Sequence, residues 1–232
     1  VYETSSGKKL FNLAGKSSSR MQSIVFSKDN KYILAVNKNE FFKWSSKDGS
    51  LILNETFYHQ EKKGNDETNN ITLSSNGSLV AGTMHSDVDH NKKTEFAKKH
   101  NITMHEDMFV YDVAKHKILF KSKCKVMCNN FTFSRDSKLL AINTYKTIDI
   151  YNVSNWKKVR QIKVSKFDTN YIIDFKFNKK GDEIFVFYQV GQIQSFGKYS
   201  LRKNKVIKKK LVFENSASKR TGKGIYGSEI KF

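Results

Sequence analysis

Short stretches of alternating apolar and polar residues run along most of the chain, separated by turns rich in Asp, Asn, Ser and Gly. Alternation with a period of two predicts β-strands that bury one face. One phrase recurs with the same order: an apolar strand end, a short polar turn, and a new apolar strand. Its copies occupy residues 26–33, 73–80, 133–140 and 177–184. The pattern therefore predicts an array of similar strand–turn–strand units.

Two further strands are predicted after a copy of the phrase. In the first unit they cover residues 40–44 and 51–54, and in the third unit residues 147–151 and 159–164. Four short strands in a repeat of about 40–45 residues are typical of a propeller blade. The predicted fold class is therefore all-β, a β-propeller of four-stranded antiparallel blades.

Each third strand ends in an aromatic residue followed by a polar one. The four pairs are Trp44-Ser45, Tyr111-Asp112, Tyr151-Asn152 and Tyr199-Ser200. They stand where WD40 repeats carry Trp-Asp, and residues 133–140 resemble that family's strand–turn–strand consensus, with Arg135 where Pro is usual. Over nearly its whole length the chain resembles the WD40 family. No unit shows a convincing Gly-His before its first strand, and only one pair keeps the Asp, so we describe the chain as WD40-like.

The repeat divides a single propeller domain, residues 1–232, into blades. Complete blades are predicted at 19–57, 68–122, 127–165 and 170–213, and partial ones at 1–14 and 222–232. The two ends could share one composite fifth blade, because pairing the termini protects the last sheet edge. The alternative, which we favour, is a longer propeller of which this chain is a part, since the composite blade would lack its second strand.

An insertion at residues 85–107 interrupts the second unit between its second and third strands. Insertions in repeats map to loops and often bind partners. Within it, residues 94–100 have a pattern that one or two helical turns would satisfy. The residues that we predict to contact a partner here are Phe96, Lys98, Lys99 and His100.

The same insertion is rich in imidazole and carboxylate groups, which are ligands of transition metals. The candidate metal ligands are His85, Asp87, His90, His100 and His105. Their spacing matches no metal motif with a known mechanism, and a charged loop gathers such residues by chance. We therefore predict no metal and no other cofactor.

The chain is strongly basic, with 42 Lys and Arg against 22 Asp and Glu and a net charge of +20. Such a field favours anionic partners, although an AT-biased genome would enrich Lys without any ligand. The asymmetry is steepest at 198–223, where we predict partner contacts from Arg202, Lys203, Lys205, Lys208, Lys209 and Lys210. Lys, Arg and aromatic rings suit nucleic acid. Alternatively, these lysines are the solvent face of an outer strand.

Catalytic motifs with a glycine-rich phosphate loop or a nucleophile elbow do not occur in the sequence. Asp29, Asp136 and Asp182 lie in the recurring turns, where Asp bonds local backbone. Asp174 interrupts an apolar strand and either faces a central channel or is a satisfied structural acid, the reading that we favour. Cys124 and Cys128 are predicted to be free thiols, because an extended C-x3-C segment would hold their Cα atoms too far apart.

The resemblance to WD40 proteins implies a non-catalytic scaffold that binds other proteins within a larger assembly. A second hypothesis is contact with the phosphates of RNA, nucleoprotein or anionic lipid, and a third is a hydrolase with a metal or polar cluster in the central channel. No apolar stretch approaches the ~18 residues of a transmembrane helix. No signal peptide is visible. The chain starts at Val1, as a trimmed or processed chain would, so the missing signal is weak evidence and the compartment stays open. Of the possible compartments we slightly favour the cytoplasm.

Overall fold

A computed structural model describes residues 1–15, 21–27, 29–37, 40–56, 67–85, 98–99, 101, 107–124, 128–144, 146–167, 171–190 and 193–214. Within these ranges the chain is all-β, apart from a helical turn at 98–99 and a short 3₁₀ helix, η1 (Val164–Phe167). The strands form four four-stranded sheets, and hydrogen-bonded neighbours are antiparallel.

The sheets follow one another along the chain, each built from four consecutive strands. Sheet 1 consists of β1 (Ser23–Phe26), β2 (Tyr32–Val36), β3 (Glu40–Ser45) and β4 (Leu51–Thr56). Sheet 2 consists of β5 (Glu67–Leu73), β6 (Leu79–His85), β7 (Asp107–Asp112) and β8 (Lys117–Lys123). Sheet 3 consists of β9 (Asn129–Phe133), β10 (Leu139–Asn143), β11 (Thr147–Asn152) and β12 (Lys158–Lys163). Sheet 4 consists of β13 (Tyr171–Phe177), β14 (Glu183–Val190), β15 (Ile193–Ser200) and β16 (Lys205–Glu214).

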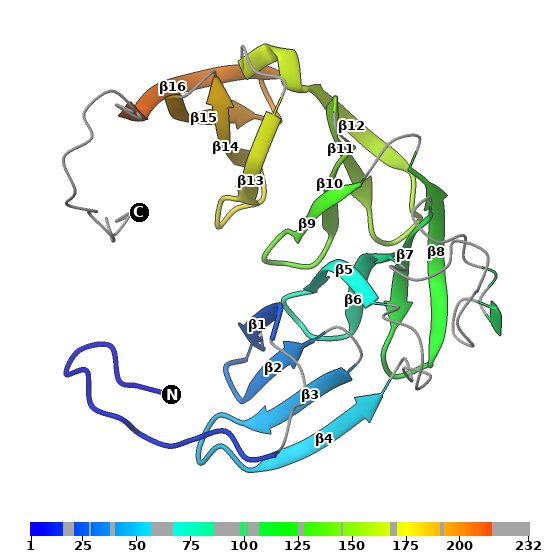
Figure 1. Cartoon of the computed structure of the whole chain (residues 1–232), viewed down its shortest axis with the longest axis vertical. Helices are drawn as coiled ribbons and strands as arrows, with labels where there is room; N and C mark the ends of the chain where they lie inside the picture. Colours follow the sequence, from blue (N-terminus) through cyan, green and yellow to red (C-terminus); the bar gives the residue numbers. More distant parts are fainter. Residues whose placement is uncertain are drawn as a thin grey trace, which may run out of the picture.

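The sheets are arranged as an open arc (Figure 1). The first strand of each sheet lies on the inner side of the arc and the fourth strand on its outer side. Along the inner side, β5 contacts β1 and β9, and β9 contacts β13. This radial repetition is compatible with a propeller-like fold.

The recurring phrase is the hairpin between the first and second strands of every sheet, as its pattern predicted. Its first and last residues pair in all four copies: Phe26 with Ile33, Leu73 with Val80, Phe133 with Leu140, and Phe177 with Ile184. The same last residue then pairs with the aromatic of the third strand, as Ile184 does with Tyr199. Because the pairing at this hairpin is the same in each sheet, one sequence phrase specifies one local geometry.

In three of the four copies the turn begins with Ser and has Asp or Asn two positions later, and hydrogen bonds explain this pattern. Ser134 Oγ donates to Asp136 Oδ1 at 2.6 Å and accepts from the backbone N–H of Leu139 at 2.9 Å. Asp136 Oδ1 also accepts from the N–H of Lys138 at 3.1 Å. Ser74 and Asn76 make the same bonds in sheet 2. The bonding of local backbone predicted for the turn aspartates is therefore confirmed for Asp29 and Asp136, whereas the Asp182 carboxylate accepts from the Asn178 side chain.

Buried apolar side chains fill the spaces between neighbouring sheets. The middle sheets are covered on both faces: Val80 belongs to the core with sheet 1, and Leu79 to the core with sheet 3. Between sheets 3 and 4, the largest buried side chains include Tyr199 and Phe167 of η1. Burial on both faces explains why strands such as β7 are buried at every position.

The N-terminal segment covers the outer face of sheet 1, which is the face opposite the core shared with sheet 2. Residues 1–11 form a hairpin in which Tyr2 bridges Lys9 and the N–H of Leu10 donates to the carbonyl of Val1. Phe11 and Leu13 pack on a face that includes Trp44, whose Nε1 donates to the Ala14 carbonyl at 2.6 Å. A predicted partner strand at 222–232 lies outside the described residues, so the composite blade stays a prediction.

The prediction of free cysteines was wrong, because Cys124 and Cys128 form a disulfide. Their Cα atoms are 5.6 Å apart, within the range of such bonds. Cys124 comes after the end of β8 and Cys128 before the start of β9, so the two residues flank a connection between sheets and not a continuous strand. Both side chains are buried in the core between sheets 2 and 3.

Candidate functional site

A cleft of about 510 Å³ lies between sheets 1 and 2. Its floor is apolar, with the buried side chains of Leu34, Phe41 and Val113. Tyr32 and Leu53 contribute partly buried apolar surface from β2 and β4. The recurring turns of sheets 1 and 2 close the cleft. The turn of sheet 2, at Asn76, Gly77 and Ser78, lies against sheet 1.

Charged groups of both signs stand at the rim of the cleft. Asp29, Lys43 and Glu55 line it. The Lys43 ammonium lies 3.9 Å from the centre of the Tyr32 ring, and the Glu55 carboxylate lies 3.5 Å from His116 Nε2 of sheet 2. An apolar floor with a few polar groups is the usual make-up of a site that orients a bound side chain.

Tyr111 lies beneath the contact between Glu55 and His116. Its hydroxyl is 3.4 Å from His116 Nδ1. Burial raises the pKa of the Tyr111 phenol, and the negative charges of Glu55 and Asp112 raise it further. The phenol therefore stays neutral at physiological pH and serves as a hydrogen-bonding support for the rim.

A second concave surface, which we call the basic groove, lies between the outer parts of sheets 3 and 4. It has a volume of about 380 Å³ and is lined by Lys158, Arg160, Lys163, Lys166 and Asn204, with Val159 and Gln161. The first three belong to β12, Lys166 belongs to η1, and Asn204 lies in the turn between β15 and β16. The lining thus comes almost entirely from residues 158–166, and Asn204 is its one contribution from sheet 4 among the described residues.

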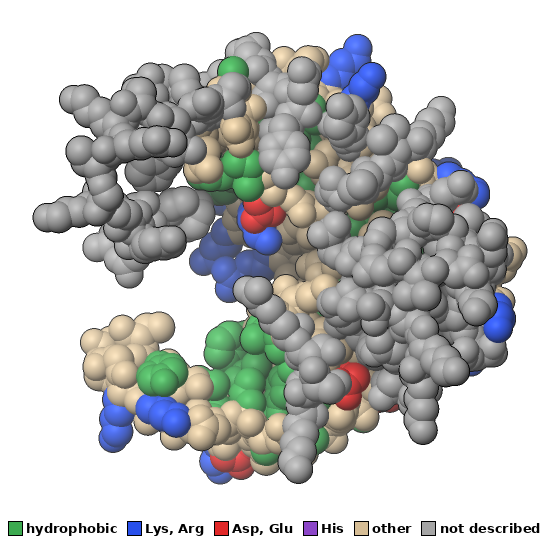
Figure 2. Space-filling model, viewed as in Figure 1, with side chains coloured by type: hydrophobic (Ala, Val, Ile, Leu, Met, Phe, Trp, Pro, Cys, Tyr) green, Lys and Arg blue, Asp and Glu red, His purple; other side chains and the backbone are tan. Residues whose placement is uncertain are grey.

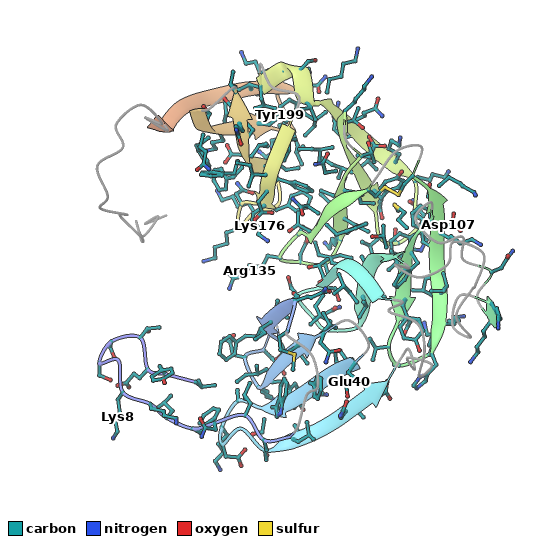
Figure 3. All side chains as sticks on the ribbon, viewed as in Figure 1. Lys8, Glu40, Asp107, Arg135, Lys176 and Tyr199 are labelled. Atoms are coloured by element: carbon teal, nitrogen blue, oxygen red, sulfur yellow. A yellow bond between two sulfur atoms is a disulfide. The ribbon has the colours of Figure 1, made fainter. Side chains whose placement is uncertain are left out.

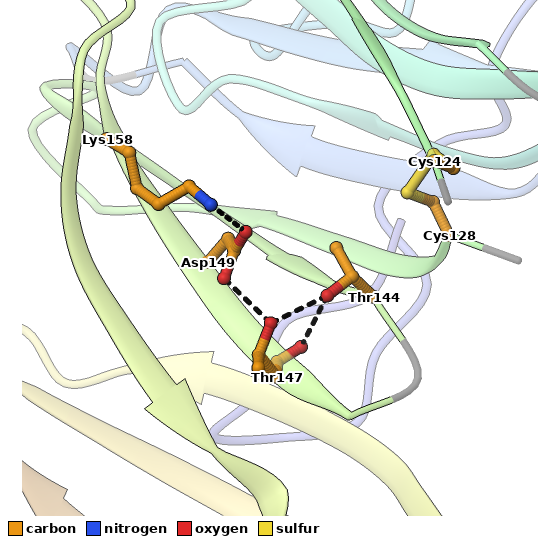
Figure 4. The surroundings of a disulfide bond; sticks show 6 residues. All are labelled: Cys124, Cys128, Thr144, Thr147, Asp149 and Lys158. Carbon is orange, nitrogen blue, oxygen red and sulfur yellow. Dashed lines mark hydrogen bonds and ion pairs between the residues drawn. A yellow bond between two sulfur atoms is a disulfide. The ribbon is translucent and has the colours of Figure 1, made fainter. Parts of the chain in front are cut away.

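A network centred on the buried Asp149 fixes the position of Lys158 (Figure 4). Asp149 is only 5% exposed, and its carboxylate lies 2.6 Å from Lys158 Nζ. It also accepts hydrogen bonds from Thr147 Oγ1 at 2.7 Å and Gln161 Nε2 at 2.9 Å. The hydrogen bond to Asp149 raises the pKa of the Lys158 ammonium, which therefore stays charged.

A third cavity, of about 460 Å³, is lined by residues in or just before the inner strands of all four sheets. Asp174 and Lys176 of β13 line it, and the Lys176 ammonium is 3.8 Å from the Asp174 carboxylate. Figure 3 shows Lys176 on the inner side of the arc. Asp174 also accepts a bond from the N–H of Phe175 at 2.8 Å. Both interpretations of Asp174 therefore apply: it lines the cavity at the centre of the arc, and its charge is paired with that of Lys176.

The insertion predicted to bind a partner is only partly described. β6 ends at His85 and β7 begins at Asp107, so the long connection joins the second and third strands of sheet 2. Lys98 and Lys99 lie in a helical turn with exposed side chains. Phe96, Asp87, His90, His100 and His105 lie outside the described residues. Among the side chains that the structure describes, no three potential metal ligands cluster.

The basic C-terminal stretch forms the turn and outer strand of sheet 4. Arg202 and Lys203 are exposed in the turn before β16, and Arg202 Nε lies 3.4 Å from Asp182. Lys205 is exposed at the start of β16. Lys208, Lys209 and Lys210 pair with Lys198, Gly197 and Phe196 of β15, and their side chains are not described. The backbone of this stretch is thus an outer strand.

The sequence prediction missed the basic groove and the Asp149 network. One signal was present, since residues 157–166 include Lys157, Lys158, Arg160, Lys163 and Lys166 and no acidic residue. No such signal marked the Asp149 network, because its residues lie on two strands and the sequence alone does not give the register between these strands.

The part of the chain that the structure describes contains no helix long and apolar enough to cross a membrane. No protein-family model matches the sequence, and a comparison with curated proteins finds no match either.

Solved structures do resemble the fold. Hydrazine synthase from Kuenenia stuttgartiensis matches 85% of this chain with a TM-score of 0.55 and 12% identity. The structure of U3-55K matches 84% of this chain with a TM-score of 0.53 and 10% identity. The chain spans about half the length of these proteins, 51% and 53% respectively. At this level of identity the likeness bears on the fold alone, and together with the four-stranded antiparallel sheets it is compatible with a propeller-like fold.

Proposed function

We propose that this chain is a WD40-like segment of a propeller and acts as a non-catalytic scaffold that binds a partner protein. The observation that carries the proposal is the cleft between sheets 1 and 2, which joins an apolar floor to a charged rim. Resemblance of the repeats to WD40 blades supports the scaffold role, because that family presents such surfaces on a rigid frame.

The chemistry of the cleft favours an extended protein segment as the ligand. Leu53 and Tyr32 offer apolar surface to one or two side chains, while Asp29 and Glu55 suit a basic residue beside them. The opposing turns pack on buried cores, so the walls are preorganised and binding orders few additional groups. We therefore expect a peptide with a hydrophobic anchor next to Lys or Arg.

A peptide library displayed on phage tests the proposal. Selection on the purified chain should enrich such peptides, and Leu53→Asp should reduce their affinity at least tenfold. Ile52→Asp is a matched control, because Ile52 is adjacent on β4 and 50% exposed but does not line the cleft. Ala114→Trp provides a second variant that narrows the cleft without removing a core side chain, since Ala114 is an exposed lining residue.

Two outcomes would contradict the proposal. In one, selection enriches no peptide that binds in solution. In the other, the selected peptides bind the Leu53→Asp, Ala114→Trp and Ile52→Asp variants equally well. Circular dichroism of each variant shows that any loss does not come from unfolding.

A further inference from the structure

We propose that the basic groove binds the phosphate backbone of a nucleic acid, independently of base sequence. The proposal concerns a different surface from the cleft and does not depend on the scaffold function. Its lining includes four cationic side chains, Lys158, Arg160, Lys163 and Lys166, and no acidic one among the described residues. In the space-filling view, Lys and Arg side chains stand at several places on the outer edge of the arc and also on its inner side (Figure 2).

The positive charge of the groove is only partly neutralised. Lys158 pairs with Asp149 at 2.6 Å. Arg160 and Lys163 have no carboxylate partner in the described part of the chain. Lys166 Nζ is held by neutral oxygens, the Tyr199 hydroxyl at 3.3 Å and the Asn204 carbonyl at 3.5 Å. Three cations are therefore available to an anion without first breaking an ion pair.

Two of the cations that line the groove are held in place before a ligand arrives. Lys158 is fixed by Asp149, and that carboxylate is itself fixed by Thr147 and Gln161. Lys166 lies over the Tyr199 ring at 5.2 Å. Preorganised charges lose less side-chain entropy on binding than free surface lysines do. This distinguishes the groove from lysines scattered over a solvated strand.

The shape of the surface favours a polyanion chain over a membrane. A bilayer presents a flat array of headgroups, whereas these cations line a concave surface between the outer parts of two sheets. An extended chain of phosphates can lie in such a surface and contact several cations in succession. Each contact releases counterions, so affinity should fall steeply with salt.

The two amide side chains in the lining, of a type that can read base edges, are already engaged: Gln161 donates to Asp149, and Asn204 accepts from the Tyr199 hydroxyl. None of the described lining residues is aromatic. The nearby Tyr199 ring is fully buried and is not available for base stacking. Proteins read sequence through base edges and stack single-stranded bases on aromatic rings. We therefore infer backbone contacts alone, with equal affinity for RNAs of different composition.

Fluorescence anisotropy with the full chain and labelled RNA tests this inference. We expect the Arg160→Gln, Lys163→Gln double variant to lose about tenfold in affinity at moderate salt. The slope of log affinity against log salt should fall by about 2, since each phosphate contact contributes about 1. The matched control is Lys8→Gln, Lys9→Gln, which removes the same charge from the N-terminal hairpin. Figure 3 shows Lys8 in that hairpin, away from sheets 3 and 4.

Several results would overturn the inference. One is an equal loss in both double variants, which would mean attraction by net charge alone. Another is a tenfold difference between RNAs of uniform but different bases. A third is that the Arg160→Gln, Lys163→Gln variant binds RNA as the parent chain does but loses binding to phosphatidylserine vesicles or to polyglutamate. Thermal unfolding of both variants confirms that each remains folded.

Discussion

Each recurring turn places one residue in the left-handed region of backbone conformation. The residues are Asn30, Gly77, Ser137 and Gly181, with φ between 58° and 73°. Asn and Gly are the residue types that adopt this conformation most readily. A second set of turns repeats the device at Gly49, His116, Trp156 and Asn204. The left-handed conformation recurs at these turn positions although the residue type varies, so the fold requires the conformation and not a particular residue.

The two glycines of the first set differ in what surrounds them. A Cβ added at Gly77 would lie 2.1 Å from Leu34 Cδ1, whereas one at Gly181 would lie 3.6 Å from Ser134 Cβ. Both alanine variants incur the cost of positive φ, about 1–2 kcal/mol. We predict that Gly77→Ala loses about 1–3 kcal/mol more than Gly181→Ala, because Leu34 must also move. Urea unfolding measures both, and equal losses would contradict the prediction.

The turn aspartates should make stability depend on acid pH. The hydrogen bond from Ser27 is the main cause of the lowered pKa of Asp29. At Asp136, burial acts to raise the pKa, but the bonds from Ser134 and Lys138 outweigh it and the pKa is lowered. The stabilisation is therefore present above the unfolded pKa of about 3.9 and is lost as the pH falls through the lower folded values.

The natural Asn76 shows that an amide can fill the same position, since its Oδ1 accepts equivalent bonds. We predict that the Asp29→Asn, Asp136→Asn variant stays close to the parent chain in stability at neutral pH. Below about pH 4 it should lose less stability than the parent chain does. Thermal midpoints across this range measure the difference, and parallel curves for the two chains would show that these carboxylates do not contribute.

Residue roles were predictable where the partner is local and hidden where it is distant. The turn carboxylates bond residues two positions away, so their role followed from the sequence. Gln161 reaches Asp149 across a strand pair whose register the sequence does not state. The basic turn at Arg202 was foreseen, while the cations of β12 were not singled out although they are close together in the sequence.

At the scale of elements, the alternation of side chains predicted the strands well, because both period and turn residues recur. Sheet 3 illustrates this: strands predicted at 147–151 and 159–164 are observed at Thr147–Asn152 and Lys158–Lys163. The error came at a junction. We treated residues 124–128 as extended, whereas the strands stop on either side of the two cysteines.

The disulfide at this junction gives a test at the same scale. Iodoacetamide treatment of the denatured, unreduced chain should label neither Cys124 nor Cys128. Replacing both by Ala should lower the free energy of unfolding by about 2 kcal/mol, the chain-entropy contribution of so short a loop. Unfolding with and without reductant provides the control, because reductant should destabilise the parent chain only. Full labelling without reductant would show that the thiols are free.

At the scale of the whole molecule, the two ends of the arc differ from its middle. The middle sheets are buried on both faces, but within the described part of the chain the outer face of sheet 1 is covered by the N-terminal segment alone. Ile24 and Phe26 of β1 are 57% and 55% exposed. Hydrophobic side chains gather over sheet 1 beside the opening of the arc (Figure 2). We expect protein contacts at an exposed apolar surface of this kind.

The N-terminal segment should therefore act as part of the core. Phe11 and Leu13 are partly buried against a face that includes Trp44, and Gly49 leaves room for the Phe11 ring. We predict that Phe11→Ala with Leu13→Ala lowers the free energy of unfolding by roughly 2–4 kcal/mol, because both changes remove apolar contacts. The fluorescence emission of Trp44 should shift to longer wavelength, measured in a Trp156→Phe background.

Tyr2→Ala with Leu10→Ala is the control, since these side chains are 64% and 53% exposed and should contribute less than about 0.5 kcal/mol each. Equal losses in the two pairs would mean that the segment stabilises the hairpin and not the face of sheet 1.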